Sequence, residues 1–166
     1  MDYSLSLPMT KEDNINYQGV VEVTNQTGDN KLYEDTYKIA KYFKRELNYD
    51  RVPFELSGIS SKPYSTLLFT QIDYDLKAAE EDNHYTIYGA CYFNKVNLFK
   101  EQHEETWVLR WVWIHPFFRN RGDFRKLWGV MEEKYGDFYI DKPVSCNMQK
   151  FLDRVESEHL IFDVPI

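Results

Sequence analysis

The chain has 166 residues, a net charge of −7 and a pI near 5.1, with 43% hydrophobic and 28% charged residues. This composition is that of a globular protein, and the length predicts a single domain over residues 1–166. The acidic balance argues against nucleic acid as the main partner, because affinity for a phosphate backbone comes chiefly from clustered Lys and Arg. It mildly favours a cationic partner such as an amine.

The cysteines and the hydropathy of the chain bear on metal binding, on cellular compartment and on membrane contact. Cys91 and Cys146 are far apart and form no CxxC pattern, so neither a disulfide framework nor a zinc site is expected, and no metal is predicted. Residues 1–13 lack the basic region and apolar run of a signal peptide. No stretch approaches the roughly 18 uninterrupted apolar residues of a membrane span. We therefore expect a cytoplasmic protein that does not contact a membrane.

The first half of the chain is predicted to contain two strands and one helix. Residues 17–24 form a short strand in this interpretation, followed by a turn in which Asn30 caps the next helix. Residues 65–76 form the second strand. The helix between them is expected over 31–47, where apolar residues recur at helical spacing: Leu32, Ile39, Ala40, Phe43 and Leu47.

A hairpin is predicted in the middle of the chain. Residues 84–99 and 106–114 are rich in β-branched and aromatic residues, and the polar segment 100–105 connects them. Because the second strand is apolar on both faces, it is expected at the centre of a sheet that is covered on both sides. Strict alternation places Trp107, Leu109, Trp111 and Trp113 on one face and Val108, Arg110, Val112 and Ile114 on the other.

The last third alternates helices and strands. The expected elements are helix 121–135, strand 137–140, helix 145–157 and strand 159–166. The first of these helices carries an apolar stripe at positions i, i+3, i+4, i+7 and i+11, starting at Phe124. Strand, helix and strand over 106–140 form a βαβ unit with parallel strands. The predicted fold class is α/β, with a mixed sheet and helices on both faces.

The join between strand 106–114 and helix 121–135 has the features of an anion site. A helix N-terminus offers unpaired N–H groups and the positive end of the helix dipole. In α/β sheets, ligands bind at the carboxyl ends of parallel strands. Gly122 has no side chain to block the approach of an anion to the backbone, and Arg119 and Arg121 add charged donors.

The stretch VWIHPFFRNRGDFRKL, residues 112–127, resembles motif A of the GNAT superfamily of acyl-CoA-dependent N-acyltransferases. That motif follows a hydrophobic strand with a proline, an Arg or Gln, a glycine and a leucine at fixed spacing. Pro116, Arg119, Gly122 and Leu127 stand at the matching positions. The order of the following elements also agrees, so the resemblance covers about 106–166, whereas the first hundred residues match loosely.

The resemblance implies a GNAT-like fold and a transferase that uses acetyl-CoA, or another acyl-CoA, as cosubstrate. Its acyl group would pass to an amine by direct attack. The loop amides would hold the pyrophosphate, and the preceding strand would pair with the pantetheine arm, with the acyl carbonyl near the amide of Val112. The cofactor-binding residues implied are Val112, Trp113, Ile114, Arg119, Asn120, Arg121, Gly122, Asp123 and Phe124.

Two positions depart from the pattern of the family. Phe124 stands where a second small residue is usual, and its helical spacing favours the core over the anion site. The tyrosine that usually acts as general acid for the leaving thiolate has no clear equivalent, because the matching place holds Leu152 or Arg154.

Candidates for the base that removes the amine proton are Glu104 and Glu105, just before the central strand. His84 and His103 are alternatives, and each of the four also fits a solvent-exposed position. Arg110, a charge on an apolar strand, either pairs with an acid or lines the acceptor groove.

Three classes of function stay open at this point. The first is an N-acyltransferase with a small-molecule or protein amine as acceptor. The second is a catalytically silent GNAT-like module that binds CoA or a partner, which Phe124 and the missing tyrosine favour. The third is an acidic docking protein, which the even spread of carboxylates along the chain disfavours. The acceptor and the oligomeric state stay open, a dimer included.

Overall fold

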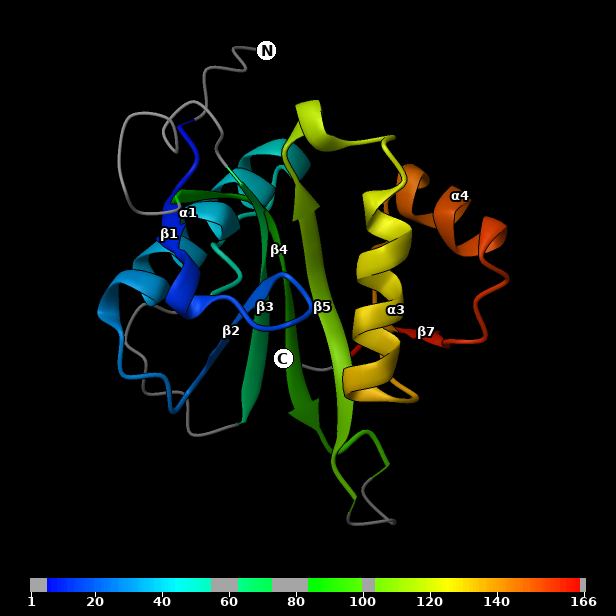
Figure 1. The fold of residues 1–166 in the computed structure, drawn as a ribbon. Helices are drawn as coiled ribbons and strands as arrows, with labels where there is room; N and C mark the ends of the chain where they lie inside the picture. Colours follow the sequence, from blue (N-terminus) through cyan, green and yellow to red (C-terminus); the bar gives the residue numbers. More distant parts are fainter. Residues whose placement is uncertain (1–5, 55–62, 73–83, 100–103, 165–166) are drawn as a thin grey trace.

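A computed structural model describes residues 6–54, 63–72, 84–99 and 104–164 (Figure 1). Its strands are β1 (Met9–Lys11), β2 (Val20–Thr24), β3 (Tyr64–Ile72), β4 (His84–Val96), β5 (Thr106–Ile114), β6 (Tyr139–Asp141) and β7 (Ile161–Phe162). Its helices are α1 (Asn30–Leu47), α3 (Asp123–Tyr135) and α4 (Cys146–Arg154), with short 3-10 turns at Glu12–Asn14 and Pro116–Phe118.

The strands of the described residues form one mixed sheet in the order β2-β3-β4-β5-β6-β7, and β1 pairs with β4. The pairs from β2 to β5 are antiparallel, whereas β5, β6 and β7 are parallel. The mixed sheet and the βαβ unit predicted over 106–140 are therefore confirmed. β1 was not predicted from the sequence.

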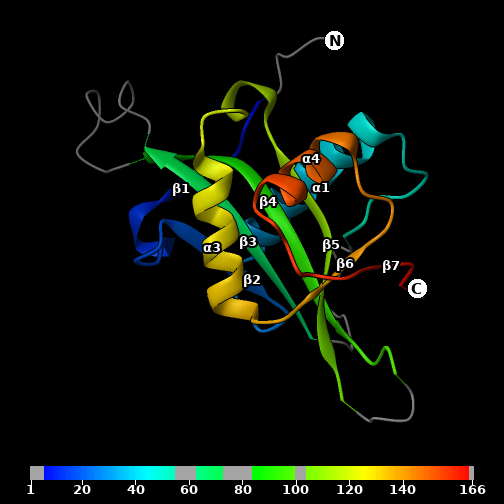
Figure 2. The same ribbon diagram turned by 90° about the vertical axis from the view of Figure 1, so that its right-hand side faces the viewer.

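Helices cover both faces of the sheet, as predicted. Figures 1 and 2 show α1 on one side and α3 with α4 on the other. On the α1 side, Ile39 and Phe43 pack in a buried cluster with Leu68 of β3. On the opposite side, Met131 of α3 packs in a second cluster with Phe93 of β4. The central strands separate these two cores.

β5 contains a bulge that overturns the predicted common face of its tryptophans. Its pairing with β4 skips Arg110, so this strand carries one extra residue. An extra residue reverses the alternation of side chains beyond it. Trp107 and Leu109 therefore belong to the cluster under α3, whereas Trp111 and Trp113 belong to the cluster under α1.

Arg110 itself pairs with an acid, the first of its two predicted roles. Its guanidinium donates to Asp141 Oδ2 of β6 at 2.8 Å and, through Nε, to Asn94 Oδ1 of β4 at 2.8 Å. The bulge thus places a charged side chain where it connects the central strand to both of its neighbours.

Several predicted boundaries shift. Asp29, not Asn30, caps α1, because its side chain accepts the N–H of Lys31. α3 begins at Asp123 instead of 121, because Gly122 adopts a left-handed conformation with φ of 81°. The predicted segments 73–76, 100–103 and 165–166 lie outside the described residues. Five elements are shorter than predicted: Val20–Thr24, His84–Val96, Tyr139–Asp141, Cys146–Arg154 and Ile161–Phe162.

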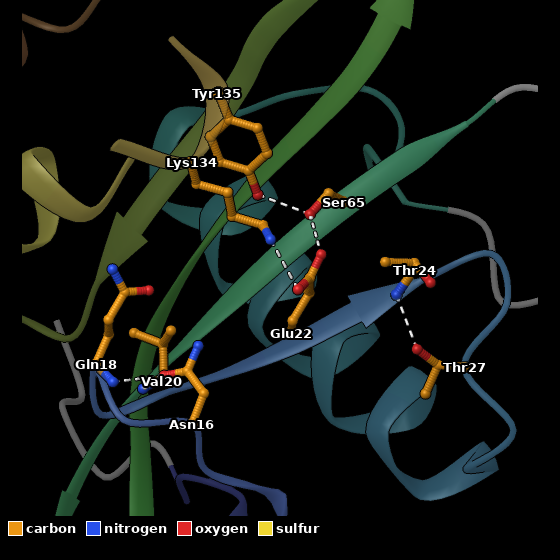
Figure 3. Close-up of polar contacts among 9 residues, drawn as sticks. All are labelled: Asn16, Gln18, Val20, Glu22, Thr24, Thr27, Ser65, Lys134 and Tyr135. Atoms are coloured by element: carbon orange, nitrogen blue, oxygen red, sulfur yellow. Dashed lines mark hydrogen bonds and ion pairs between the residues drawn. The ribbon is translucent and has the colours of Figure 1, made fainter. Parts of the chain in front are cut away.

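The C-terminal end of α3 is closed by a paired polar network (Figure 3). The hydroxyls of Tyr135 and Ser65 lie 2.7 Å apart, and Ser65 donates to Glu22 Oε1 at 3.2 Å. Lys134 Nζ donates to Glu22 Oε2 at 2.8 Å. Phe93 stacks on the Tyr135 ring with centroids 3.9 Å apart, so the network lies against the apolar core.

Candidate functional site

β5 and β6 separate at the opposite end of α3. The two strands pair only at Val108 with Tyr139 and at Leu109 with Ile140, and β5 then continues to Ile114 paired with β4 on its other side. A cavity of about 900 Å³ opens beside this part of β5. Its walls are the last turn of α1, the end of β5, the loop into α3, the first turn of α3, and α4.

The free edge of β5 lines this cavity. The N–H of His115 donates to the Tyr88 carbonyl of β4 at 2.8 Å. Because backbone groups alternate in direction along a strand, those of Trp113 also point toward β4, and those of Val112 and Ile114 point the other way. Val112 and Ile114 thus present their backbone groups where β6 has ended. Trp113 was also predicted to bind the cofactor. Because its backbone groups face β4, only its side chain is available for such a contact.

The loop between β5 and α3 leaves a run of backbone donors without protein partners. Asn120 and Gly122 have positive φ values of 60° and 81°, and α3 starts directly after them. Within the described part of the chain, the N–H groups of residues 120–124 donate to no protein acceptor. A Cβ at Gly122 would meet nothing within 4 Å. These donors stand at the positive end of the α3 dipole, which suits an anion.

The Arg119 side chain is engaged elsewhere, which differs from its expected role as an anion donor. Its two terminal nitrogens donate to the two carboxylate oxygens of Glu46 in α1, each at 2.7 Å. Its Nε donates to the Ile114 carbonyl at 2.7 Å. Trp113 Nε1 also donates to Glu46 Oε2 at 2.7 Å. The backbone N–H of Arg119 donates to the Pro116 carbonyl at 3.3 Å.

Glu46 stays ionised in this arrangement. Burial by itself would raise the pKa of Glu46, but the hydrogen bonds from Arg119 and Trp113 and the Arg119 charge outweigh burial and lower the pKa below its usual value.

The cavity is cationic although the chain is acidic. It is lined by five basic side chains and only two acidic ones, Glu46 and Asp153. Arg119 is paired with Glu46, but the other four have no ion pair within the described residues. Those four come from the loop, from α3 and from α4: Arg121, Arg125, Lys150 and Arg154. Such a lining favours a ligand with several negative charges.

Phe124 packs against the core, as its spacing predicted, but it is only partly buried and also lines the cavity. Its ring lies 4.5 Å from that of Phe151 in α4 and 6.0 Å from that of Trp128, measured between centroids. Of the two residues at the place of the missing tyrosine, Leu152 is buried in the core and Arg154 lines the cavity.

The predicted bases do not reach the cavity. Glu104 and Glu105 are exposed and lie before the first residue of β5, roughly 25 Å from its last residues at about 3.3 Å per residue. His84 does not line the cavity, and His103 lies outside the described residues. Among the described residues, no His, Tyr or Cys lines it.

The cysteines offer no nucleophile there. Cys91 is fully buried in the core under α3, and burial raises the pKa of its thiol. Cys146 is exposed at the start of α4 and does not line the cavity.

Sequence reasoning missed Glu46 and the polar face of α4. Glu46 lies three residues after Phe43, on the apolar face of α1. A single acid on an apolar face is the sequence signal that could have identified it. In α4, Asn147, Lys150 and Arg154 recur at helical spacing and all line the cavity. Their common face could have been found by the same pattern.

Neither a metal-binding cluster nor a membrane-spanning helix is present among the described residues. No three His, Cys, Asp or Glu side chains gather there in a way that could hold a metal ion. No helix in that part of the chain combines the length and the apolarity that crossing a membrane requires.

Comparison with known proteins gives matches at the level of structure alone. Neither a family model nor a curated protein matches the sequence. The xEco2 acetyltransferase domain, solved with a K105-CoA conjugate, matches with a TM-score of 0.59 at 10% identity, over 92% of this chain and 96% of that one. A ribosomal-protein-alanine N-acetyltransferase from Brucella melitensis biovar Abortus 2308 matches with a TM-score of 0.55 at 11% identity, over 89% and 98% of the two chains.

Both neighbours are acetyltransferases by name, and both are covered almost completely by this chain. The mixed sheet and its helices on both faces agree with the fold class predicted from the sequence, and the resemblance of residues 112–127 pointed to the same fold. The chain therefore has the GNAT fold.

Proposed function

We propose that this protein binds an acyl-CoA in the cavity beside β5 and transfers the acyl group, acetyl in the simplest case, to an amine. The observation that carries the proposal is the coincidence of three features in one cavity. These are a free strand edge, the amides of 120–124 and four cations, and neither the amides nor the cations have a partner among the described residues. A long ligand with amide groups along its length and phosphates at one end satisfies all three.

Each part of the ligand has a matching surface. The pyrophosphate binds the amides of residues 120–124, where no side chain of Gly122 intervenes. The pantetheine arm pairs with the backbone of Val112 and Ile114, in the place of a neighbouring strand. The thioester then lies near Val112, where the cavity reaches Phe43 and Leu47 on the α1 side. An acceptor amine enters from that side of the sheet.

The reaction needs little from side chains beyond positioning and charge. The neutral amine attacks the thioester carbonyl carbon, the C–N bond forms, and the C–S bond breaks. The sulfur leaves as a thiolate whose charge is opposed by the cations of the cavity, Lys150 and Arg154 among them. The proton lost by the amine passes to water. The K105-CoA conjugate in the structural neighbour supports the use of an amine and CoA in this fold.

A second candidate function is CoA binding without transfer. The observation that favours it concerns the two acidic side chains that line the cavity among the described residues: both Glu46 oxygens are engaged, and Asp153 accepts the amide of Gln149 through Oδ1. In this case the same cavity holds CoA, and the chain acts as a CoA-dependent binding module.

An acyl-transfer assay separates the two functions. The protein is incubated with acetyl-CoA and a panel of small amines and lysine-containing peptides, and both free thiol and the mass of the acceptor are recorded. Release of CoA with an acetylated acceptor supports the transferase, provided that Gly122→Glu abolishes it. Saturable binding of acetyl-CoA without any acetylated acceptor supports the binding module instead. Failure of both binding and transfer would rule out both functions.

A further inference from the structure

We infer that Glu46 is a positioning residue for the CoA cradle: its carboxylate holds Arg119 against the end of β5 and thereby fixes the loop that carries the anion-binding amides. This inference rests on the proposed function of the cavity. It assigns a role to a residue of α1, which lies 73 positions before Arg119 in the sequence.

The contacts form a closed set around the end of β5. Glu46 accepts both terminal nitrogens of Arg119 and the indole N–H of Trp113, all at 2.7 Å. Arg119 completes the set by donating Nε to the carbonyl of Ile114 at 2.7 Å. One carboxylate therefore connects α1 to the strand and to the loop at once. A bidentate pair of this kind fixes orientation as well as distance.

The loop needs such a fixed point because few other contacts hold it. Beyond Arg119, two residues of the loop, Asn120 and Gly122, are in the left-handed region, and the amides of 120–124 have no protein acceptor among the described residues. Arg119 is the last residue before this stretch whose side chain is tied to the body of the protein. A shift of Arg119 changes where the following amides point.

The same contacts exclude a role for Glu46 as general base. Both of its oxygens already accept charged or indole donors, and these hold the pKa of Glu46 below its usual value. The carboxylate thus has little tendency to take a proton at neutral pH. Its contribution is geometric, and it acts through Arg119.

The test compares two matched substitutions at partly buried ion pairs. Glu46→Gln keeps the shape of the side chain but removes the charge and one of the two acceptors for Arg119. Glu22→Gln makes the same change in the pair with Lys134 at the far end of α3. The two carboxylates are similarly exposed, with relative side-chain accessibilities of 26% and 37%. CoA affinity is measured by calorimetry, and amide hydrogen exchange is followed in the peptide that contains residues 119–124.

Glu46→Gln is expected to weaken CoA binding by about tenfold and to speed exchange in the loop, whereas Glu22→Gln changes neither. Because Glu46 acts through Arg119, the double variant with Arg119→Gln should bind CoA no more weakly than Arg119→Gln alone. Unchanged affinity and exchange in Glu46→Gln overturn the inference and leave the proposed function intact. If the wild-type protein itself binds no CoA, the proposed function fails and this inference falls with it.

Discussion

The two ends of α3 differ in how the polar groups around them are used. At the paired end, which comprises Glu22, Ser65, Lys134 and Tyr135, each of these side chains bonds to another. At the open end, which comprises the free edge of β5, residues 119–125 and the cavity-lining face of α4, donors outnumber acceptors.

The difference follows from where β5 and β6 part. The pairing at Leu109 and the ion pair of Arg110 with Asp141 hold the strands together up to the bulge. Beyond it, β6 stops and β5 continues, so backbone groups that a neighbouring strand would satisfy face a cavity. Residues 120–122 are exposed, so water can solvate their amides until a ligand takes its place. The polar side chains of the paired end already bond to one another and offer a ligand no such donors.

The largest effect is expected from the core beneath the paired end. Phe93→Ala removes a fully buried ring that stacks on Tyr135, and the cavity left behind should cost about 3–5 kcal/mol of unfolding free energy. Urea denaturation measures this loss. CoA affinity of the molecules that remain folded should stay within about twofold of wild type, because the two ends share no partners. A large loss of affinity would show that the ends are coupled.

The glycines at the two ends of α3 give a direct comparison. Gly122 and Gly136 both have positive φ, 81° and 63°, and a Cβ at either would meet open space. Glutamate at either position therefore pays a similar backbone cost of about 1–2 kcal/mol. Only Gly122→Glu puts a carboxylate at the anion site, and it should weaken CoA binding by at least about 100-fold, or roughly 2.7 kcal/mol.

Calorimetric titration of both glycine variants checks this difference, and circular dichroism confirms that both are folded. Equal losses of affinity in the two variants would mean that backbone strain, not charge at the loop, explains the effect. Full affinity in Gly122→Glu would show that the loop does not hold the phosphates.

The smallest effect is expected from the hydroxyl of Tyr135. Tyr135→Phe removes its bond to Ser65, but Ser65 can still donate to Glu22, so the loss should be about 1 kcal/mol. Thermal or urea unfolding measures it. Because burial raises the pKa of this phenol, the hydroxyl is neutral at physiological pH, and the loss should not depend on pH between about 6 and 8. A marked pH dependence in that range would contradict this assignment.

The sequence predicted the elements that depend on local pattern. The spacing in α3 and the strand–helix–strand order around it were sufficient to place residues 119–124 at a helix start beside a central strand. The face of each tryptophan could not be predicted, because the bulge at Arg110 depends on pairing with β4, and alternation alone gives no sign of it. The Glu46–Arg119 contact was hidden for a similar reason, since it joins residues 73 positions apart.

The two glutamates predicted from the sequence as general bases lie far from the cavity. Glu104 and Glu105 are close in sequence to the central strand, but the cavity lies at the far end of that strand. Each residue along a strand adds about 3.3 Å, so residues beside the start of β5 are far from its end. Residues from other elements, such as Arg154 of α4, come nearer to the cavity than the strand's own first neighbours.

The central claim is that the open end binds the phosphates and the pantetheine arm of CoA. Calorimetric titration of the intact chain with acetyl-CoA, repeated at low and high salt, tests it most directly. A single saturable site is expected, with an affinity that falls as salt rises, because the cavity is lined by four cations that have no ion pair within the described residues. The absence of any binding heat at millimolar acetyl-CoA, together with unchanged exchange of the 119–124 amides, would contradict it.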